Sequence, residues 1–304
     1  MVIKTCAICG SNKHVRVLYK ASFNEKELNS TIYSARRLPD KIHYKIVKCY
    51  KCGLIFSSPI LPPNKIFNFY RDSICTYNAQ IPYLIKTYMK LFKLSAKHVP
   101  KNPKVLEIGC GNAFFLDALY KKGVKKVYGV EPSSTMVREA PKHIRENILV
   151  EVFKKNQFSK DSFDIVACFH TLDHMIDPNE VLTEIYRILR PGGTVLMVIH
   201  DTDGLSVKLF GERSPIFDVE HIYLFNKSTI RKIFEKHEFL VEEISDVKNT
   251  YPLWYWWSMS GFPKTLKAMW LKILKLTRIG NFDFTLSGGN IYILAKKDLE
   301  IRRK

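Results

Sequence analysis

The sequence lacks any long run of apolar residues, although 46% of its 304 residues are hydrophobic. A membrane-spanning helix needs about 20 consecutive apolar residues, so no segment predicts one. The first ten residues, MVIKTCAICG, also lack the apolar core of a secretory signal peptide. We therefore expect a cytoplasmic protein, in which the seven cysteines are free thiols or metal ligands and not disulfides.

Acidic residues are scarce in the first third of the chain. Residues 1–100 contain 17 Lys and Arg but 4 Asp and Glu, and the whole chain has 48 against 29, a net charge of +19. Such a basic segment favours an anionic partner, for example nucleic acid, a phosphate-bearing substrate or an anionic membrane. A coding bias towards lysine would give the same composition with no binding function, so charge alone does not assign a partner.

The chain has no dinucleotide-binding G-x-G-x-x-G motif, because position 114 is Phe where the third glycine would stand. Residues 105–131 instead read VLEIGCGNAFFLDALYKKGVKKVYGVE. This pattern predicts a buried strand, a turn at Gly109 and Gly111, a helix, and a second strand that ends in Glu131. That arrangement holds a nucleoside-bearing cofactor at the carboxyl edge of an open α/β sheet.

The same segment resembles motif I of class I S-adenosylmethionine-dependent methyltransferases, in which an acid and one further residue precede G-x-G-x-G. Here Ala113 replaces the last glycine. Residues 162–199, SFDIVACFHTLDHMIDPNEVLTEIYRILRPGGTVLMVI, resemble the region that follows this motif in the same family. The resemblance implies an α/β fold with a Rossmann-like seven-stranded sheet, and S-adenosylmethionine as the cofactor.

The resemblance also implies roles for individual residues. Gly109 and Gly111 would line the methionine part of the cofactor, and Glu107 would orient its amino end through water. Glu131 would bind the ribose hydroxyls. Phe153, after the third strand, stands where relatives contact adenine, so we expect stacking and backbone contacts there.

Two C-x-x-C pairs lie near the beginning of the chain, at Cys6 and Cys9 and at Cys49 and Cys52, each followed by a glycine. Each pair can present two thiolates to one tetrahedral Zn²⁺, and four thiolates predict a structural zinc site without an open position for catalysis. Two separate redox pairs are the alternative, but neither lies in a βαβ pattern. We predict a zinc ribbon over residues 1–60, a linker with covering helices over 61–103, and the methyltransferase domain over 104–304.

Methyl transfer to a hydroxyl group needs the donor and acceptor held in line and a base that removes the proton. His170, Asp173 and His174 follow the predicted fourth strand, and His200 follows the fifth. The three histidines are candidate bases, with His200 and His174 ranked ahead of the loop residue His221. The spacing of His170, Asp173 and His174 also resembles a divalent-metal cluster of ubiquinone-biosynthesis-type methyltransferases, with His170 in place of the first Glu. A purely structural role remains the alternative for each histidine.

The whole chain resembles bacterial methyltransferases with an N-terminal zinc ribbon, a group that includes sugar-modifying enzymes. The resemblance implies O-methylation of a saccharide or a sugar-linked small molecule. Methylation of rRNA or tRNA is the second hypothesis, and a non-catalytic binding module is the third. The absence of N/D-P-P-Y and of Pro-Cys after the fourth strand disfavours methylation of DNA amines and of cytosine C5.

An aromatic and cationic insertion, residues 250–289, separates the last two predicted strands. Residues 251–257 read YPLWYWW, and a helix is predicted from 264 to about 278. A cationic amphipathic helix beside an aromatic cluster is typical of a segment that lies in a bilayer interface, so we expect peripheral membrane contact through 251–278. Packing of the helix on the core or on a second subunit is the alternative. The apolar arc of this helix consists of Leu266, Met269, Trp270, Ile273, Leu274 and Leu276.

Overall fold

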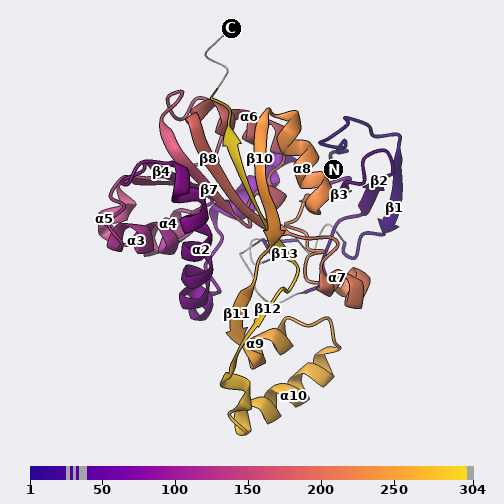
Figure 1. Cartoon of the computed structure of the whole chain (residues 1–304). Coiled ribbons are helices and arrows are strands. Elements are labelled where there is room, and N and C mark those ends of the chain that lie inside the picture. Colours follow the sequence, from indigo (N-terminus) through magenta and orange to yellow (C-terminus); the bar gives the residue numbers. More distant parts are fainter. Residues whose placement is uncertain (25–27, 30–31, 34–39, 300–304) are drawn as a thin grey trace.

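The computed structural model describes residues 1–24, 28–29, 32–33 and 40–299. Its centre is a seven-stranded sheet in the order β10-β13-β8-β7-β4-β5-β6 (Figure 1). The five adjacent strands β8, β7, β4, β5 and β6 pair in parallel. Strand β13 runs antiparallel to both β8 and β10. The bounds are β4 (Val105–Ile108), β5 (Val127–Val130), β6 (Ile148–Leu149), β7 (Phe163–Phe169), β8 (Leu189–His200), β10 (Phe239–Asp246) and β13 (Asn290–Lys297).

The chain changes direction across the sheet at β4. It continues from β4 to β5 and β6 on one side, and then returns to β7 and β8 on the other side. Ligands of open α/β sheets bind at the carboxyl ends of the strands where this change occurs. Gly109 after β4 and His170 after β7 therefore begin the two loops that border the expected crevice.

Alternate residues of the central strands pack against helices on opposite faces of the sheet. Leu106 and Val166 belong to the core that faces α6 and α8, whereas Val105 and Ile165 belong to the core that faces α2 and α3. Burial on both faces explains the continuous apolar sequence of β7. The helices are α1 (Pro63–Arg71), α2 (Ile81–Ser95), α3 (Phe114–Lys121), α4 (Ser134–Glu139), α5 (Lys142–Arg145), α6 (Pro178–Ile188), α7 (Leu205–Phe210), α8 (Lys227–Lys236), α9 (Leu253–Ser258) and α10 (Lys264–Leu276).

Two boundaries differ from the sequence prediction. The third strand, expected over residues 148–152, is limited to β6, because this strand lies at the edge of the sheet and Leu149 and Val150 are exposed. The fifth strand starts at Leu189 and includes the turn at Gly192 and Gly193, with a register shift in its pairing to β7.

The N-terminal residues form a second sheet whose last strand comes from residues 223–224, within the larger domain. The order is β1-β2-β3-β9, with β1 (Val15–Tyr19), β2 (Ile46–Cys49), β3 (Ile55–Ser57) and β9 (Tyr223–Leu224). The backbone NH of Ser57 donates to the carbonyl of Ile222, and Lys236 of α8 donates to the carbonyl of Ala7 at 2.8 Å. The N-terminal sheet is therefore joined to the larger domain by β-pairing, side-chain hydrogen bonds and a shared core.

A protrusion, residues 249–286, extends away from the sheet between β10 and β13 (Figure 1). It consists of the hairpin of β11 (Asn249–Pro252) and β12 (Asp283–Leu286) with α9 and α10 between these strands. Among the described residues, no helix has the length and apolar character needed to cross a membrane. Short 3-10 helices complete the structure: η2 (Asn78–Gln80), η3 (Ala96–His98), η4 (Leu172–His174), η5 (Gly211–Arg213) and η6 (Ile279–Asn281).

Candidate functional site

The loop after β4 turns sharply at the carboxyl edge of the sheet. Gly109, Gly111 and Ala113 all have positive φ, at 73°, 55° and 60°. A Cβ on Gly109 would lie 2.4 Å from Oγ1 of Thr171, so a larger residue does not fit there. Ala113 is fully buried and precedes α3, which means that alanine adopts the left-handed conformation where related sequences have glycine.

Glu131 follows β5 and is fixed by this loop. One carboxylate oxygen accepts a hydrogen bond from the backbone NH of Gly111 and the other from that of Ser133, both at 2.9 Å. Burial raises the pKa of Glu131, and the two backbone donors act in the opposite direction. The carboxylate is held at the tip of the strand, where its remaining lone pairs can accept from two adjacent hydroxyl groups.

Glu107 is a buried acid in β4 with an unsatisfied oxygen. No donor among the described residues lies within hydrogen-bond distance of its Oε2. Burial, and then the charge of Glu131, raise the pKa of Glu107 well above its usual range. A cationic ligand group in the adjoining cavity would satisfy this oxygen and favour its ionised form. S-adenosylmethionine carries such a group, its ammonium, so the residues present fit that cofactor.

A single cavity of about 470 Å³ joins these residues to a group of histidines. This volume is typical of small-molecule and cofactor sites. All five residues predicted to contact the cofactor line the cavity: Glu107, Gly109, Gly111, Glu131 and Phe153. The three predicted bases, His170, His174 and His200, line the same cavity, as does His221.

Four chain segments bring the histidines together. His170 follows β7, His174 ends η4, and His200 ends β8. The ring centroids of His170 and His200 lie 4.8 Å apart, and those of His200 and His221 lie 4.5 Å apart. The fourth segment, which precedes β9, contributes His221, whose Nδ1 lies 2.7 Å from the carbonyl oxygen of Ile216.

The buried carboxylate of Asp173 lies among these histidines and interacts with their charges. Its Oδ2 lies 2.6 Å from Nδ1 of His200, and Asp173 is only 1% exposed. Burial alone would raise its pKa, but the hydrogen bond from His200 and the nearby His174 hold the pKa of Asp173 well below its usual range. An ionised Asp173 accepts a hydrogen bond from the NH group at Nδ1 of His200, which leaves Nε2 as the basic nitrogen.

The structure separates two of the candidate bases by their surroundings. Burial lowers the pKa of His174 to about 4, and its Nδ1 lies 3.1 Å from the hydroxyl of Tyr70 in α1. A general base is most efficient when its pKa is near the working pH, so His174 is poorly suited to this role at neutral pH. His200, oriented by Asp173, is the better placed candidate.

A metal ion is the alternative occupant of this group. Ligand atoms of Asp173, His200 and His221 lie within 4.8 Å of one another. The hydrogen bond to Oδ2 of Asp173 occupies Nδ1 of His200. Oδ1 of Asp173 has no hydrogen-bond partner among the described residues, so both a carboxylate–imidazole pair and a metal ion are compatible with this geometry.

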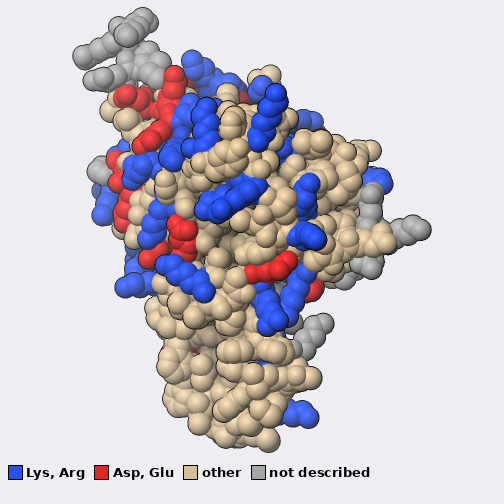
Figure 2. Space-filling view, turned by 90° about the vertical axis from the view of Figure 1, so that its right-hand side faces the viewer, with Lys and Arg blue, Asp and Glu red and all other residues tan. Residues whose placement is uncertain are grey.

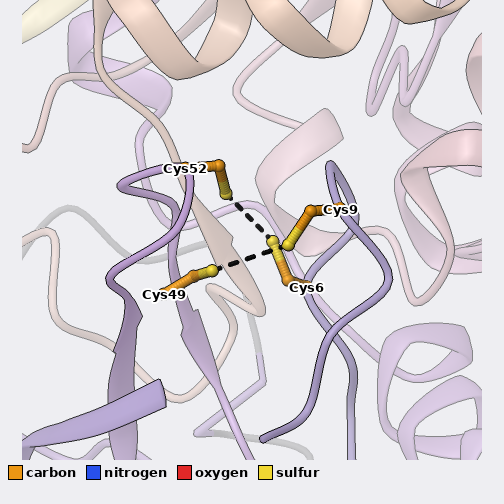
Figure 3. A group of neighbouring side chains, drawn as sticks. All are labelled: Cys6, Cys9, Cys49 and Cys52. Atoms are coloured by element: carbon orange, nitrogen blue, oxygen red, sulfur yellow. Dashed lines mark hydrogen bonds between the residues drawn. The ribbon is translucent and has the colours of Figure 1, made fainter. Parts of the chain in front are cut away.

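The four N-terminal cysteines form a separate cluster, shown in Figure 3. Sγ of Cys6 lies 3.2 Å from that of Cys52, and Sγ of Cys9 lies 3.6 Å from that of Cys49. Tetrahedral coordination with Zn–S bonds of about 2.3 Å would place sulfurs about 3.8 Å apart, close to these distances. The glycines after each pair both have positive φ, so the two loops turn alike, and the cluster is compatible with a zinc ribbon.

Sequence reasoning found three features from local patterns: the loop of Gly109 and Gly111 after β4 (the cofactor loop), the acid after β5, and the cysteine pairs. It missed the contribution of Tyr70, because nothing near that residue indicates contact with His174, 104 positions later. It placed Asp173 only in a possible metal cluster with His170 and His174. The helical turn η4 instead directs Asp173 to His200, on the next strand of the sheet.

Comparisons with known proteins agree with this geometry. A family model described as a methyltransferase domain matches residues 77–244, more than half of the chain. The ubiquinone biosynthesis O-methyltransferase of Methylococcus capsulatus is 32% identical over 100 residues, which cover 30% of this chain and 41% of that protein. The protein of the same name from Coxiella burnetii is 30% identical over 117 residues, covering 37% and 47%. The chain thus spans less than half the length of these curated relatives.

Solved structures show the same architecture. A chain from the complex between the Haloferax volcanii Trm112 methyltransferase activator and a methyltransferase superposes with a TM-score of 0.51 at 17% identity, over 73% of this chain and 95% of that one. At this identity the likeness concerns the fold alone. Together with the family model and the cavity at the carboxyl edge of the sheet, it establishes that the chain belongs to the methyltransferase-domain family and has the class I S-adenosylmethionine-dependent fold.

Proposed function

We propose that this protein transfers the methyl group of S-adenosylmethionine to a hydroxyl oxygen of a saccharide or a sugar-linked small molecule. The observation that carries the proposal is the pair of Asp173 and His200 in the cavity that also contains the cofactor loop. Such a pair supplies the base that a hydroxyl acceptor needs and that a more acidic acceptor would not. The O-methyltransferase names of the curated relatives also support oxygen as the acceptor atom.

In this mechanism the cofactor supplies a methyl group on a positively charged sulfur. Glu131 would accept hydrogen bonds from the ribose hydroxyls, Glu107 would face the ammonium group, and Phe153 would stack on the adenine. Nε2 of His200 would take up the proton that the acceptor hydroxyl loses when its oxygen receives the methyl group. Asp173 stabilises the imidazolium ion that forms, as an ionised carboxylate does for a hydrogen-bonded histidine.

The charge of the cavity supports a neutral, hydroxyl-rich acceptor. Buried Asp218 and Glu220 line the cavity near His221, and Lys154 is the single Lys or Arg among the described lining residues. Carboxylates accept hydrogen bonds from sugar hydroxyls but repel phosphate groups. This distribution weakens the RNA hypothesis, although the basic N-terminal third would still suit RNA bound outside the cavity.

We expect label from methyl-tritiated S-adenosylmethionine to enter the glycan fraction, and not the RNA fraction, of extracts from cells that lack this gene. Filter binding to RNA should be weak and nonspecific. For an RNA enzyme, the binding constant for single-stranded RNA would instead fall as salt rises. The fall is about 0.7 log units per neutralised phosphate for each tenfold increase in salt concentration. Label in RNA, with tight and salt-sensitive binding, would establish the second hypothesis. Cofactor binding without label in any fraction would indicate the non-catalytic module.

We further propose that Cys6, Cys9, Cys49 and Cys52 hold one structural Zn²⁺. The support is the approach of the four sulfurs and the paired glycine turns. Four thiolates complete a tetrahedral shell, so the ion would stabilise the fold and take no part in methyl transfer. Reduced thiols require a reducing compartment, which agrees with the expected cytoplasmic location.

Metal analysis after gel filtration should find about one zinc per chain in the wild-type protein, because four thiolates bind Zn²⁺ tightly. Cys6→Ser and Cys49→Ser should each remove most of this zinc. Cys75→Ser is the matched control, since Cys75 lies outside the cluster and its thiol donates to Asn78. Full zinc content in both cluster variants would refute the zinc site.

A further inference from the structure

The protrusion, residues 249–286, is a firmly packed element. Nε1 of Trp256 donates to the carbonyl of Phe284 at 3.0 Å, and Nε1 of Trp257 donates to the carbonyl of Lys267 at 3.3 Å. The ring of Trp257 also stacks on Phe262, with centroids 5.1 Å apart. Trp256 and Trp257 therefore hold α9 to β12 and to α10. Contact of residues 251–278 with a bilayer stays a prediction.

The apolar surface of the protrusion comes instead from α10 and the segment after it. Leu276 is 84% exposed and Phe282 is 66% exposed, and six further large apolar side chains lie between 41% and 51%. Leu266 and Leu274 of the predicted apolar arc are half-buried, while the rest of the arc faces outward. The exposed residues of this part are Met269, Trp270, Ile273, Leu276, Ile279, Phe282, Phe284 and Leu286.

This surface continues onto α7. The ring of Phe210 in α7 lies 5.4 Å from that of Phe262, and Gly261 packs directly against Phe210. Leu205 and Leu209 of the same helix are 55% and 65% exposed. Figure 2 shows the protrusion, at the bottom of that view, as a largely uncharged surface below the charged body of the protein. Apolar patches of this extent mark interaction surfaces in soluble proteins.

The charges of the protrusion are mostly positive. Residues 249–286 contain five Lys and Arg, among them the exposed Lys272 and Arg278, and one acid, the exposed Asp283. Two copies that met through this face would bring the exposed Lys272 and Arg278 of each copy close together, which opposes self-association. Apolar side chains beside cations instead fit the interface of a bilayer that contains anionic lipid.

We propose that the protrusion docks the protein on an anionic membrane surface, with α10 and residues 279–286 in the lipid interface. Met259, which follows α9, lines the catalytic cavity, so docking places the cavity near the lipid headgroups. The acceptor would then be a sugar attached to a lipid. This last step rests on the proposed function, whereas docking itself does not.

Flotation with vesicles of phosphatidylcholine and about 30% phosphatidylglycerol tests the proposal. The wild-type protein should float with these vesicles and much less with pure phosphatidylcholine. Ile273→Glu with Leu276→Glu should lower the partition coefficient at least about tenfold, because it places two charges on the face that would enter the interface. Leu240→Glu is the matched control, since Leu240 is 53% exposed in β10, outside the protrusion.

Thermal melting and cofactor calorimetry on the same variants separate the outcomes. If the melting temperature and the cofactor affinity of the double variant equal those of the wild type, the variant is folded. A loss of docking in that variant then leaves the methyltransferase assignment unaffected. A wild-type protein that stays unbound to anionic vesicles, or equal partitioning of the wild type and double variant, overturns the proposal. A wild-type dimer that the double variant converts to monomer, without an effect on vesicles, assigns this face to a second copy.

Discussion

Replacement of His200 by alanine is expected to lower kcat for methyl transfer by about 10²- to 10⁴-fold, the usual contribution of a general base. The variant loses the imidazole that Asp173 orients, and His174, with a pKa of about 4, is a poor substitute. The measurement is the rate of tritium transfer from saturating labelled S-adenosylmethionine into the glycan fraction. Calorimetry should show cofactor affinity within about twofold of wild type, since His200 acts on the acceptor.

Two further variants make this prediction specific. His200→Gln keeps a donor for buried Asp173 but has no basic nitrogen, so it should be as slow as His200→Ala and better folded. Asp173→Asn should give an intermediate rate, because the histidine remains but loses its carboxylate partner. Full activity of His200→Gln would exclude His200 as the base. Activity that disappears on treatment with a chelator, and returns with a divalent cation, would favour metal coordination by this group.

Replacement of Glu131 by alanine is expected to weaken S-adenosylmethionine binding by about ten- to a hundredfold. Each hydrogen bond to a charged group contributes roughly 1.5–3 kcal/mol, and the ribose offers two hydroxyls. The same change also removes the acceptor for the backbone NH groups of Gly111 and Ser133, so the cofactor loop loses a restraint. Isothermal calorimetry with the cofactor gives the affinity directly.

Glu131→Gln separates the two contributions to that loss. Glutamine retains one oxygen that can accept from the loop but has no charge, so its affinity should lie between those of the wild type and the alanine variant. Glu151→Ala is the control, because Glu151 lies on the surface and its carboxylate contacts Lys154 and Gln157. Unchanged cofactor affinity in Glu131→Ala would remove Glu131 from the cofactor site.

The sequence was sufficient for those parts of the fold that depend on neighbouring residues. The buried strand β4, its glycine turn and the acid after β5 lie within 27 consecutive positions, and each has its own local pattern. The spacing of the two C-x-x-C pairs alone predicts that Cys6, Cys9, Cys49 and Cys52 form one cluster, because thiolate pairs with this spacing have few other uses. These features required no knowledge of the tertiary structure.

The remaining features depend on contacts between distant segments. The position of Tyr70 beside His174 follows from the packing of α1 over the crevice, and no local pattern encodes it. Helical periodicity correctly grouped the apolar residues of α10, but it could not show that Leu266 packs inward while Leu276 stays exposed. That division depends on the surface that α9 offers to α10.

The pairing of β3 with β9 also affects how the chain folds as it is synthesised. The hydroxyl of Ser57 donates to the carbonyl of His221, 164 residues further along the chain. Until this later segment leaves the ribosome, β3 has an open edge and the sheet that carries Cys49 is incomplete. Closure of such a long loop is slow, so the N-terminal cysteines acquire their final environment only late in translation.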